Sequence, residues 1–435
     1  MKETRASIAL LLFILAAHIA YLLPQVNVES ELSQSYSITT CPGSVNQARS
    51  TALLPSKQVG IRDIVRKNAD FYRSTTGNPT LSRGAIVVAG NPRNTLEIQT
   101  KSGKWTSAVT CSSGTTSSWF VGGTANVTSQ GKIVLVNSGL SEATAEVTSY
   151  SENGPVEPKS ITVKPLTERE IRIDSLDPGA ERLVLKVKVI SGRITSFLTD
   201  ERERGLNNLG GDFVSPIIEP ATELIIPALP TRIGNSSSIS HTLRVMSTEA
   251  VDTKISVEII SREGVFVPVG LGNVSVNAGE VIDLPIKDLD LGKQYFAIKV
   301  VANSPIVAGV RTAVSYGSVS DFTWNSASPN FDRVSFNVYG LEPTISFVGD
   351  NVRVYVEWRL RDGKTASKNL TGQEILNWKV PPNSRLVTLT ARSKVSAGMY
   401  WATSDGVAYL PITSAATLES AARPTADISV IQPQT

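Results

Sequence analysis

Residues suited to acid–base chemistry are concentrated in one stretch of the chain. The stretch holds four carboxylates and two arginines: Asp200, Glu201, Arg202, Glu203, Arg204 and Asp212. A glycoside hydrolase needs two carboxylates that face each other across a cleft. Alternating acidic and basic residues are instead typical of a solvated loop, and we expect such a loop here.

Nucleophilic catalysis by serine is not indicated either. The sequence lacks Gly-x-Ser-x-Gly, and of its two histidines only His241 lies beyond the apolar N-terminal segment. A serine triad would have to use this histidine, which we place at the start of an expected strand. We therefore predict that the protein is not an enzyme and has no catalytic residue.

Cys41 and Cys111 are the only cysteines in the sequence. Their spacing is not the Cys-x-x-Cys of a redox pair, and neither has an adjacent histidine. In an oxidising compartment a lone pair most simply forms one disulfide, which would close a loop of about 70 residues and add roughly 4 kcal/mol of stability. With both cysteines expected in a disulfide and one of the two histidines, His18, in the apolar N-terminal segment, too few ligands remain for zinc fingers or iron–sulfur clusters, so we predict no metal and no cofactor.

Tryptophans and arginines give two weak candidates for ligand binding. Trp105 and Trp119 lie near the second cysteine. If exposed, they would form a stacking platform for a carbohydrate; if buried, they would pack against the disulfide, as in immunoglobulin domains. Trp358, Arg359 and Arg361 form a small basic edge that could contact an anionic envelope polymer, although edge strands also carry such charges to prevent aggregation.

The N-terminus determines the expected compartment. Residues 6–23 form an almost uncharged apolar stretch, ASIALLLFILAAHIAYLL. As a helix it would be roughly 27 Å long, close to the thickness of the hydrocarbon core of a bilayer. Lys2 and Arg5 precede it, so the positive-inside rule places residues 1–5 in the cytoplasm and the rest outside. A cleaved signal peptide is the alternative, but the available cleavage sites contain bulky residues, and we expect an uncleaved single-pass anchor.

Composition excludes a disordered chain and gives no support to a nucleic-acid-binding protein. The chain has 435 residues, 41% of them hydrophobic, and a net charge of +3. This is enough apolar material for several cores, so the chain is not disordered by composition. The nearly balanced charge gives no reason to expect nucleic acid as a partner.

Beyond residue 84 the pattern is that of antiparallel β-structure. Short runs rich in Val, Ile and Thr, such as AIVVA (85–89), KIVLV (132–136) and LVLKVKVI (183–190), alternate with Asn, Gly, Pro and Ser. Strands at this spacing are typical of sandwiches or barrels. The segment whose apolar spacing would also suit a helix is 59–72.

The chain also repeats itself. Residues 145–158 (AEVTSYSENGPVEP) match 255–268 (ISVEIISREGVFVP), and a fainter third copy begins at residue 354. Each copy is about 80–90 residues long, the size of one immunoglobulin-like sandwich. Val187 and Val300 hold equivalent positions, and we expect both to face the core with the neighbouring lysines toward solvent.

We therefore predict an all-β fold: tandem immunoglobulin-like antiparallel β-sandwiches after one N-terminal transmembrane helix. The expected parts are a cytoplasmic stub 1–5, a transmembrane anchor 6–23, a disulfide-bearing N-terminal β region 24–131, sandwich repeats 132–215 and 216–326, a degenerate repeat 327–413, and a flexible tail 414–435.

Several short sequences resemble those of a known family. They are Cys41-Pro42-Gly43, Cys111 followed by Trp119-Phe120-Val121-Gly122-Gly123, Leu135-Val136-Asn137, Leu176-Asp177-Pro178-Gly179, Gly192-Arg193-Ile194, Gly205-Leu206, Asp212-Phe213-Val214 and Val307-Ala308-Gly309. The family is a set of actinobacterial secreted or membrane-anchored proteins with a domain of unknown function. The resemblance covers roughly residues 40–325, with Phe213 where the family has Trp. It implies an extracytoplasmic β architecture and supplies no catalytic residue.

These observations predict a non-enzymatic, membrane-anchored extracytoplasmic protein that binds or holds a partner in the cell envelope. The partner would be an envelope protein or a cell-wall polysaccharide. The alternative is a carbohydrate-binding or carbohydrate-active envelope protein, which a concave site with two or more carboxylates beside an aromatic would favour. A third possibility is a structural spacer that holds a partner away from the membrane.

Overall fold

The structure, a computed structural model, describes most of the chain after the expected anchor. The described residues are 33–36, 38–55, 59–65, 72–73, 78–81, 84–89, 94–233, 237–287, 289, 291–317, 319–414 and 418–421. The expected stub and anchor at residues 1–23 lie outside them. Within the described ranges, no helix has the length and apolar character needed to cross a bilayer.

The described chain is all-β, as predicted. Its strands form several antiparallel sheets, and the helical element among them is one short 3-10 turn, η1, at Ile173–Ser175. The chain divides into two compact units, residues 37–418 and a smaller one made of residues 1–36 and 419–435. In the smaller unit, strand β1 (Ser33–Tyr36) pairs with β35 (Leu418–Ala421). The other described strands belong to the larger unit.

Sandwich 1 is built from two four-stranded sheets with the orders β2-β7-β4-β5 and β6-β3-β8-β9. Its strands are β2 (Ile38–Cys41), β3 (Arg49–Leu53), β4 (Gly60–Asp63), β5 (Tyr72–Arg73), β6 (Thr80–Leu81), β7 (Ile86–Ala89), β8 (Leu96–Lys101) and β9 (Trp105–Thr110). Both sheets contribute to a small core around Cys41, Ala52, Val88 and Cys111.

Two sequence predictions are decided in sandwich 1. Cys41 and Cys111 form a disulfide, with their Cα atoms 4.5 Å apart, which confirms the predicted pairing. The alternative of a helix at residues 59–72 is wrong for the described part of this segment, because Gly60–Asp63 forms a strand that pairs with β7. Pairing with a neighbouring strand overrides the local apolar spacing.

Sandwich 2 has the sheet orders β10-β16-β12-β13, with β14 also on β12, and β15-β11-β17-β18. Its strands are β10 (Ser117–Val121), β11 (Lys132–Asn137), β12 (Ala143–Ser151), β13 (Gly154–Pro155), β14 (Lys159–Val163), β15 (Thr167–Arg172), β16 (Val184–Ser191), β17 (Thr195–Arg204) and β18 (Asn207–Val214). Leu185 of one sheet and Leu198 of the other belong to the same core.

In sandwich 3, the two sheets are continuous through one long strand, β25. The first part of β25 pairs with β19 and β21, and its second part pairs with β20 and β26. The strands are β19 (Ala221–Pro230), β20 (Ser237–Ser247), β21 (Thr253–Ser261), β22 (Gly264–Phe266), β23 (Val274–Val276), β24 (Val281–Ile286), β25 (Tyr295–Tyr316) and β26 (Val319–Ser326).

Sandwich 4 has the orders β27-β32-β29-β30 and β31-β28-β33-β34. Its strands are β27 (Arg333–Asn337), β28 (Thr344–Val348), β29 (Val352–Leu360), β30 (Thr365–Gly372), β31 (Ile375–Lys379), β32 (Ser384–Ala391), β33 (Ser396–Ala402) and β34 (Val407–Pro411). Phe347 and Val356 come from different sheets and share the core.

The four sandwiches have the same topology. If the strands of each sandwich, β14 and β23 aside, are numbered 1 to 8 along the chain, one sheet has the order 1-6-3-4 and the other has the order 5-2-7-8. In sandwich 3, the long strand β25 serves as both strand 6 and strand 7. Val187 and Val300 are 1% and 0% exposed and lie opposite Val147 and Val257, so the predicted equivalence is confirmed. Residues 38–110 form a further copy of this unit, which the repeats recognised in the sequence did not include.

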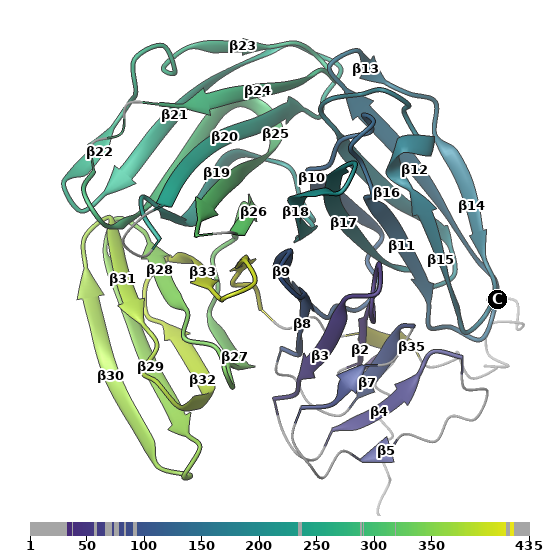
Figure 1. Ribbon diagram of the computed structural model, residues 1–435, viewed down its shortest axis with the longest axis horizontal. Helices are drawn as coiled ribbons and strands as arrows, with labels where there is room; N and C mark the ends of the chain where they lie inside the picture. Colours follow the sequence, from purple (N-terminus) through teal and green to yellow (C-terminus); the bar gives the residue numbers. More distant parts are fainter. Residues whose placement is uncertain are drawn as a thin grey trace, which may run out of the picture. The chain divides into compact units, whose positions relative to one another are not determined.

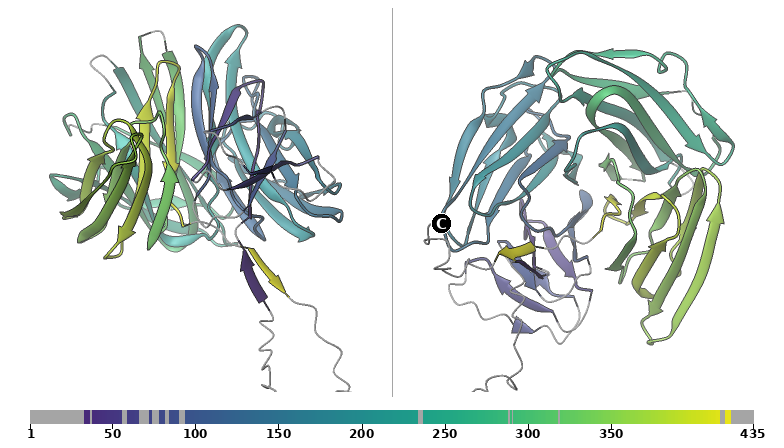
Figure 2. Two further views of the ribbon diagram at one scale, coloured as in Figure 1. Left: turned by 90° about the horizontal axis from the view of Figure 1, so that it is seen from below. Right: turned by 180° about the vertical axis from the view of Figure 1, so that it is seen from behind.

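The last strands of the four sandwiches meet one another at a common centre (Figure 1 and Figure 2). Strand β9 contacts β18, β18 contacts β26, β26 contacts β34, and β34 returns to contact β9. This closed circuit brings sandwich 4 against sandwich 1, and residues that are far apart in sequence become neighbours.

Candidate functional site

At the common centre, one carboxylate links all four sandwiches. Asp321 of β26 is 2% exposed. Its Oδ1 accepts a hydrogen bond from the backbone N–H of Gly211 (3.1 Å), and its Oδ2 accepts bonds from those of Val407 (2.9 Å) and Thr106 (3.4 Å). The donors lie in β18, β34 and β9. A Cβ at Gly406 would lie 2.2 Å from Asp321 Oδ2, so the approach requires glycine there.

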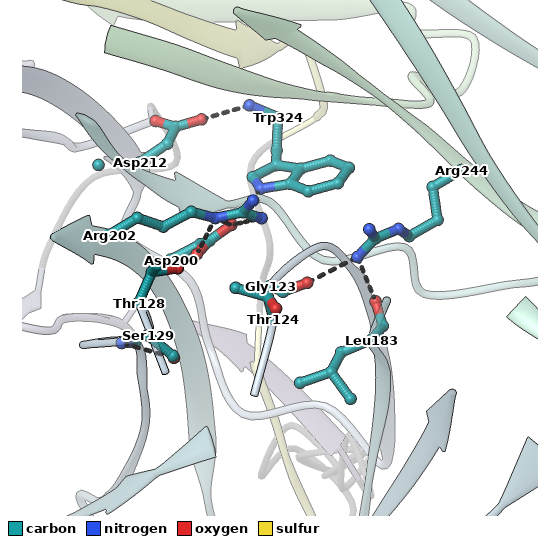
Figure 3. Close-up of polar contacts among 12 residues, drawn as sticks. Gly123, Thr124, Thr128, Ser129, Leu183, Asp200, Arg202, Asp212, Arg244 and Trp324 are labelled. Atoms are coloured by element: carbon teal, nitrogen blue, oxygen red, sulfur yellow. Dashed lines mark hydrogen bonds and ion pairs between the residues drawn. The ribbon is translucent and has the colours of Figure 1, made fainter. Parts of the chain in front are cut away.

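Asp212 of β18 extends this polar centre. The Ser107 hydroxyl donates to Asp212 Oδ1 (2.6 Å), and the backbone N–H of Trp324 donates to Oδ2 (2.6 Å; Figure 3). Burial raises the pKa of Asp212 well above its usual range, and burial also raises the pKa of Asp321 to about 8. Both carboxyls therefore favour the protonated form more than an exposed aspartate does.

Asp200 of β17 is buried but remains charged. Burial alone would raise its pKa, but the charge and hydrogen bonds of Arg202 and the Trp324 indole N–H hold the pKa below the usual value. Arg202 Nη2 lies 2.7 Å from Asp200 Oδ2, and Trp324 Nε1 donates to the same oxygen at 2.8 Å. Arg244 lies over the Trp324 ring, 4.7 Å from its centroid, and donates to the carbonyl of Gly123 (Figure 3).

The polar centre corrects the sequence interpretation of this stretch. Residues 200–212 are not a solvated loop: they belong to the hairpin of β17 and β18, and Asp200, Glu201 and Asp212 are buried. The charges are tolerated because each has a partner, such as the Lys101 ammonium 2.5 Å from Glu201 Oε1. The cavity that Asp200 and Asp212 line measures only about 10 Å³, which is too small for a substrate.

The two tryptophans near Cys111 are both buried, at 4% exposure each. Trp105 donates its indole N–H to Glu201 (3.1 Å). Trp119 packs against Tyr150, with ring centroids 5.6 Å apart. They do not form an exposed stacking platform, and neither belongs to the core cluster around the disulfide.

The alternation of β29 places Trp358 and Arg359 on opposite faces, and Arg361 lies just beyond the strand. Trp358 is half-buried and packs against Trp378, with ring centroids 5.7 Å apart. Arg359 is exposed on the other face of the strand, opposite Thr365. Arg361 follows the strand, and its guanidinium lies 4.8 Å from the centroid of the Tyr339 ring.

Arg361 lines a groove between sandwich 1 and sandwich 4. The groove has a volume of about 580 Å³, and its charged and aromatic lining residues are Arg49 of β3, Arg385 of β32, Arg361 and Tyr339. We call it the arginine groove. None of its lining residues is acidic, and no ion pair joins these arginines to a carboxylate among the described residues.

A second groove, of about 470 Å³, lies between sandwiches 1 and 2 and has the opposite character. Its charged lining residues are four glutamates and two lysines: Lys101, Lys132, Glu168, Glu170, Glu201 and Glu203. The carboxylates are already paired; Glu170, for example, lies 2.6 Å from Lys132, and Glu168 accepts the backbone N–H of Ala85 at 2.7 Å. No aromatic side chain lines this groove among the described residues.

A family of unknown function, DUF5719, matches residues 75–369 of the chain. The chain belongs to this family. The DUF5719 match starts later and ends later than the resemblance at residues 40–325, and it therefore includes Tyr339 and Arg361 but neither Arg49 nor Arg385. No curated protein matches the chain.

Of the arginine groove, sequence reasoning found Arg361 and missed Arg49, Tyr339 and Arg385. No local pattern marks the missed residues, since Arg49 lies in the first sandwich and Tyr339 and Arg385 lie in the last. Contacts between strands far apart in sequence, such as that of β34 with β9, bring sandwiches 1 and 4 together.

Proposed function

We propose that the protein is a non-enzymatic extracytoplasmic binding or scaffold protein of the cell envelope, and that its arginine groove holds an anionic group of an envelope polymer. The observation that carries the proposal is the convergence of Arg49, Arg361 and Arg385 in one concave surface that, among the residues the structure describes, no carboxylate lines.

The chemistry of the groove favours phosphate or carboxylate as the bound group. A guanidinium presents planar N–H donors that match the oxygens of these anions and keeps its charge at any physiological pH. Three like charges gathered without a counter-charge repel one another, and an anion relieves this repulsion. Tyr339 beneath Arg361 fixes the plane of that guanidinium, which lowers the entropy lost on binding.

The rest of the molecule supports binding rather than reaction. The buried carboxylates of the polar centre have no room for a substrate, and the glutamates of the second groove are paired. The shared contacts of Asp321 hold the four sandwiches in fixed positions. We infer that each sandwich is an immunoglobulin-like unit and that the whole presents a rigid surface.

An extracytoplasmic location is part of the proposal. The apolar segment at residues 6–23, following Lys2 and Arg5, would anchor the chain with its N-terminus in the cytoplasm. The Cys41–Cys111 disulfide agrees with an oxidising compartment. The resemblance to actinobacterial secreted or membrane-anchored proteins points the same way.

The test is the affinity of the full chain, purified in detergent, for inorganic polyphosphate, with neutral dextran as the comparison polymer. Arg361→Gln should weaken polyphosphate binding about fivefold or more, because a charge-assisted contact contributes about 1 kcal/mol or more. Arg359→Gln is the matched control, since this exposed arginine is two residues away and does not line the groove. Equal affinities for the two variants, or equal binding of dextran and polyphosphate, would refute the proposal.

A further inference from the structure

A glutamate of sandwich 2 contacts two side chains of sandwich 1. Glu201 of β17 is 2% exposed. The ammonium of Lys101, at the end of β8, lies 2.5 Å from its Oε1. The side-chain amide of Asn46, in the turn between β2 and β3, donates from Nδ2 to its Oε2 at 2.6 Å. The two oxygens of one buried carboxylate therefore hold the nitrogen of an amine and the nitrogen of a primary amide next to each other.

Further contacts fix this arrangement. Asn46 Nδ2 also donates to the backbone carbonyl of Gln130 (3.2 Å), which orients the amide with its nitrogen toward Glu201. The backbone N–H of Gln130 donates in turn to the carbonyl of Glu201 (2.8 Å). The buried Trp105 donates its indole N–H to Glu201 Oε1 (3.1 Å), beside Lys101. The carboxylate and the amide are thus held in position by groups that take no part in a reaction between them.

This combination of contacts is specific to Glu201. Glu170, for example, pairs with Lys132 and with no side-chain amide. Glu181 accepts from the amide of Asn126 and pairs with no lysine. Among the described residues, Glu201 is the one carboxylate that contacts both a lysine ammonium and the nitrogen of a side-chain amide.

We propose that Lys101 Nζ and Asn46 Cγ form an intramolecular amide bond, with Glu201 as the group that transfers the protons. Acyl transfer from an amide to an amine needs a nucleophile, a carbonyl carbon and an acid–base group within hydrogen-bond reach of both nitrogens. Lys101, Asn46 and Glu201 supply these three parts. Because they are in contact in the folded chain, the amine and the amide have a high effective concentration toward each other.

The reaction consumes no added reagent. A proton passes from Lys101 Nζ to Glu201 Oε1 and leaves a neutral amine, which attacks Asn46 Cγ and forms a C–N bond. Glu201 gives its proton to Asn46 Nδ2 and takes the second proton from Lys101 Nζ. The Cγ–Nδ2 bond breaks, and ammonia leaves. Nothing is oxidised or reduced, and the chain loses the mass of one ammonia, about 17 Da.

The bond forms once in each chain and is not enzymatic turnover, so it is compatible with a binding protein and does not rest on the function proposed above. It closes a loop of about 55 residues in sandwich 1, which overlaps the loop closed by the Cys41–Cys111 disulfide. Because Glu201 comes from β17, the bond forms only after sandwich 2 has folded against sandwich 1.

The test is the intact mass of the full chain, purified in detergent, with the disulfide reduced. Most molecules should be lighter than the sequence mass by one ammonia, and tryptic digestion should give one branched peptide that contains both Asn46 and Lys101. A chain of full mass, or one about 1 Da heavier through deamidation of Asn46, would overturn the proposal.

Glu201→Gln removes the proton-transfer group and should leave Asn46 and Lys101 in separate peptides. Glu203→Gln is the matched control, because Glu203 lies 3.8 Å from the Lys101 ammonium but does not hydrogen-bond to Asn46. This control should keep the cross-link. Equal cross-linking in the two variants would contradict the role of Glu201.

Lys101→Arg keeps the proposal testable if Glu201→Gln does not fold. The variant keeps a positive charge beside Glu201 but has no amine that can form the amide bond. Its circular dichroism should match that of the wild type, its mass should show no loss of ammonia, and its melting temperature should be several degrees lower. A loss of ammonia that persists in this variant would assign the reaction to another pair of residues.

Discussion

At the scale of single residues, Asp321 decides how the sandwiches meet. Its carboxylate accepts backbone N–H groups from β9, β18 and β34, all at a buried position. In Asp321→Asn, the amide nitrogen would face at least one of these donors; unlike a carboxyl oxygen, which can still accept a hydrogen bond when it is protonated, the NH2 group only donates and would leave that donor without an acceptor. We expect a loss of about 2–4 kcal/mol in the free energy of unfolding, since each unpaired buried group costs about 1–3 kcal/mol.

Urea unfolding of the wild type and of Asp321→Asn measures this loss. Asp362→Asn is the control, because Asp362 is exposed in the turn between β29 and β30. If the two variants have the same stability, Asp321 does not hold the sandwiches together.

The same residue gives a prediction about pH. Burial raises the pKa of Asp321 to about 8, whereas an unfolded aspartate titrates near about 3.9. The protonated folded form is therefore favoured, and the stability that Asp321 contributes is complete below about pH 4 and is lost as the pH rises through 8. Burial lowers the pKa of His241 to about 4, so its contribution is present above about pH 6.5 and is lost as the pH falls through 4.

The contributions of Asp321 and His241 oppose each other between pH 4 and 6.5, and of these two only that of Asp321 still changes between pH 6.5 and 8. Asp212, whose pKa burial also raises, changes stability in the same direction as Asp321. The free energy of unfolding should therefore fall by about 1.4 kcal/mol per pH unit in the upper range. Urea denaturation of the wild type at pH 6.5, 7.25 and 8 measures this decrease in the free energy of unfolding. The decrease should be smaller in Asp321→Asn. A fall of the same size in the variant would assign the effect to another group, such as Asp212.

At the scale of elements, the equivalence of the sandwiches gives a matched pair of substitutions. Val187 of β16 and Val300 of β25 are fully buried at the same position of sandwiches 2 and 3. Val187→Ala and Val300→Ala should each reduce the free energy of unfolding by about 1–3 kcal/mol, through lost burial and a cavity. Lys188→Gln, on the exposed face of β16, should change it little.

Urea denaturation again provides the readout. A large effect of one valine and none of the other would mean that the two positions are not equivalent in packing, despite their shared strand order.

The sequence predicted some elements well and others poorly, for identifiable reasons. The alternation around Val187 and Val300 indicated the buried face because each strand is long and places lysine beside the valine, on both sides of Val187 and before Val300. The copy at residues 38–110 was not recognised as a repeat, because its strands have only two to six residues and show too little alternation to compare with the other copies. The carboxylates at 200–212 were misread because their partners, such as Lys101 and the Trp324 indole, are distant in sequence.

At the scale of the whole molecule, the disulfide stabilises sandwich 1, which has a small core and carries Arg49 of the arginine groove. Joining Cys41 to Cys111 restricts a loop of about 70 residues, worth up to roughly 4 kcal/mol. The double variant Cys41→Ser, Cys111→Ser should unfold several degrees below the wild type in a calorimetric scan. An unchanged melting temperature would mean that sandwich 1 owes its stability to other contacts.

Closure of the four sandwiches is also what creates the arginine groove, because Arg49 and Arg385 lie on sandwiches that are first and last in the chain. Arg361 could be proposed from the sequence as part of a basic edge. Its partners in the groove could not, since the contact between β9 and β34 depends on the arrangement of all four sandwiches.

Hydrogen–deuterium exchange of the full chain with and without polyphosphate tests the central claim most directly, because it locates the ligand without assuming which residues bind it. We expect slower exchange in two segments together, Arg49–Leu53 of β3 and Ser384–Ala391 of β32, and Arg361→Gln should need about fivefold more polyphosphate for the same protection. Saturating polyphosphate that leaves both segments unchanged, or that protects only segments away from the arginine groove, would contradict it.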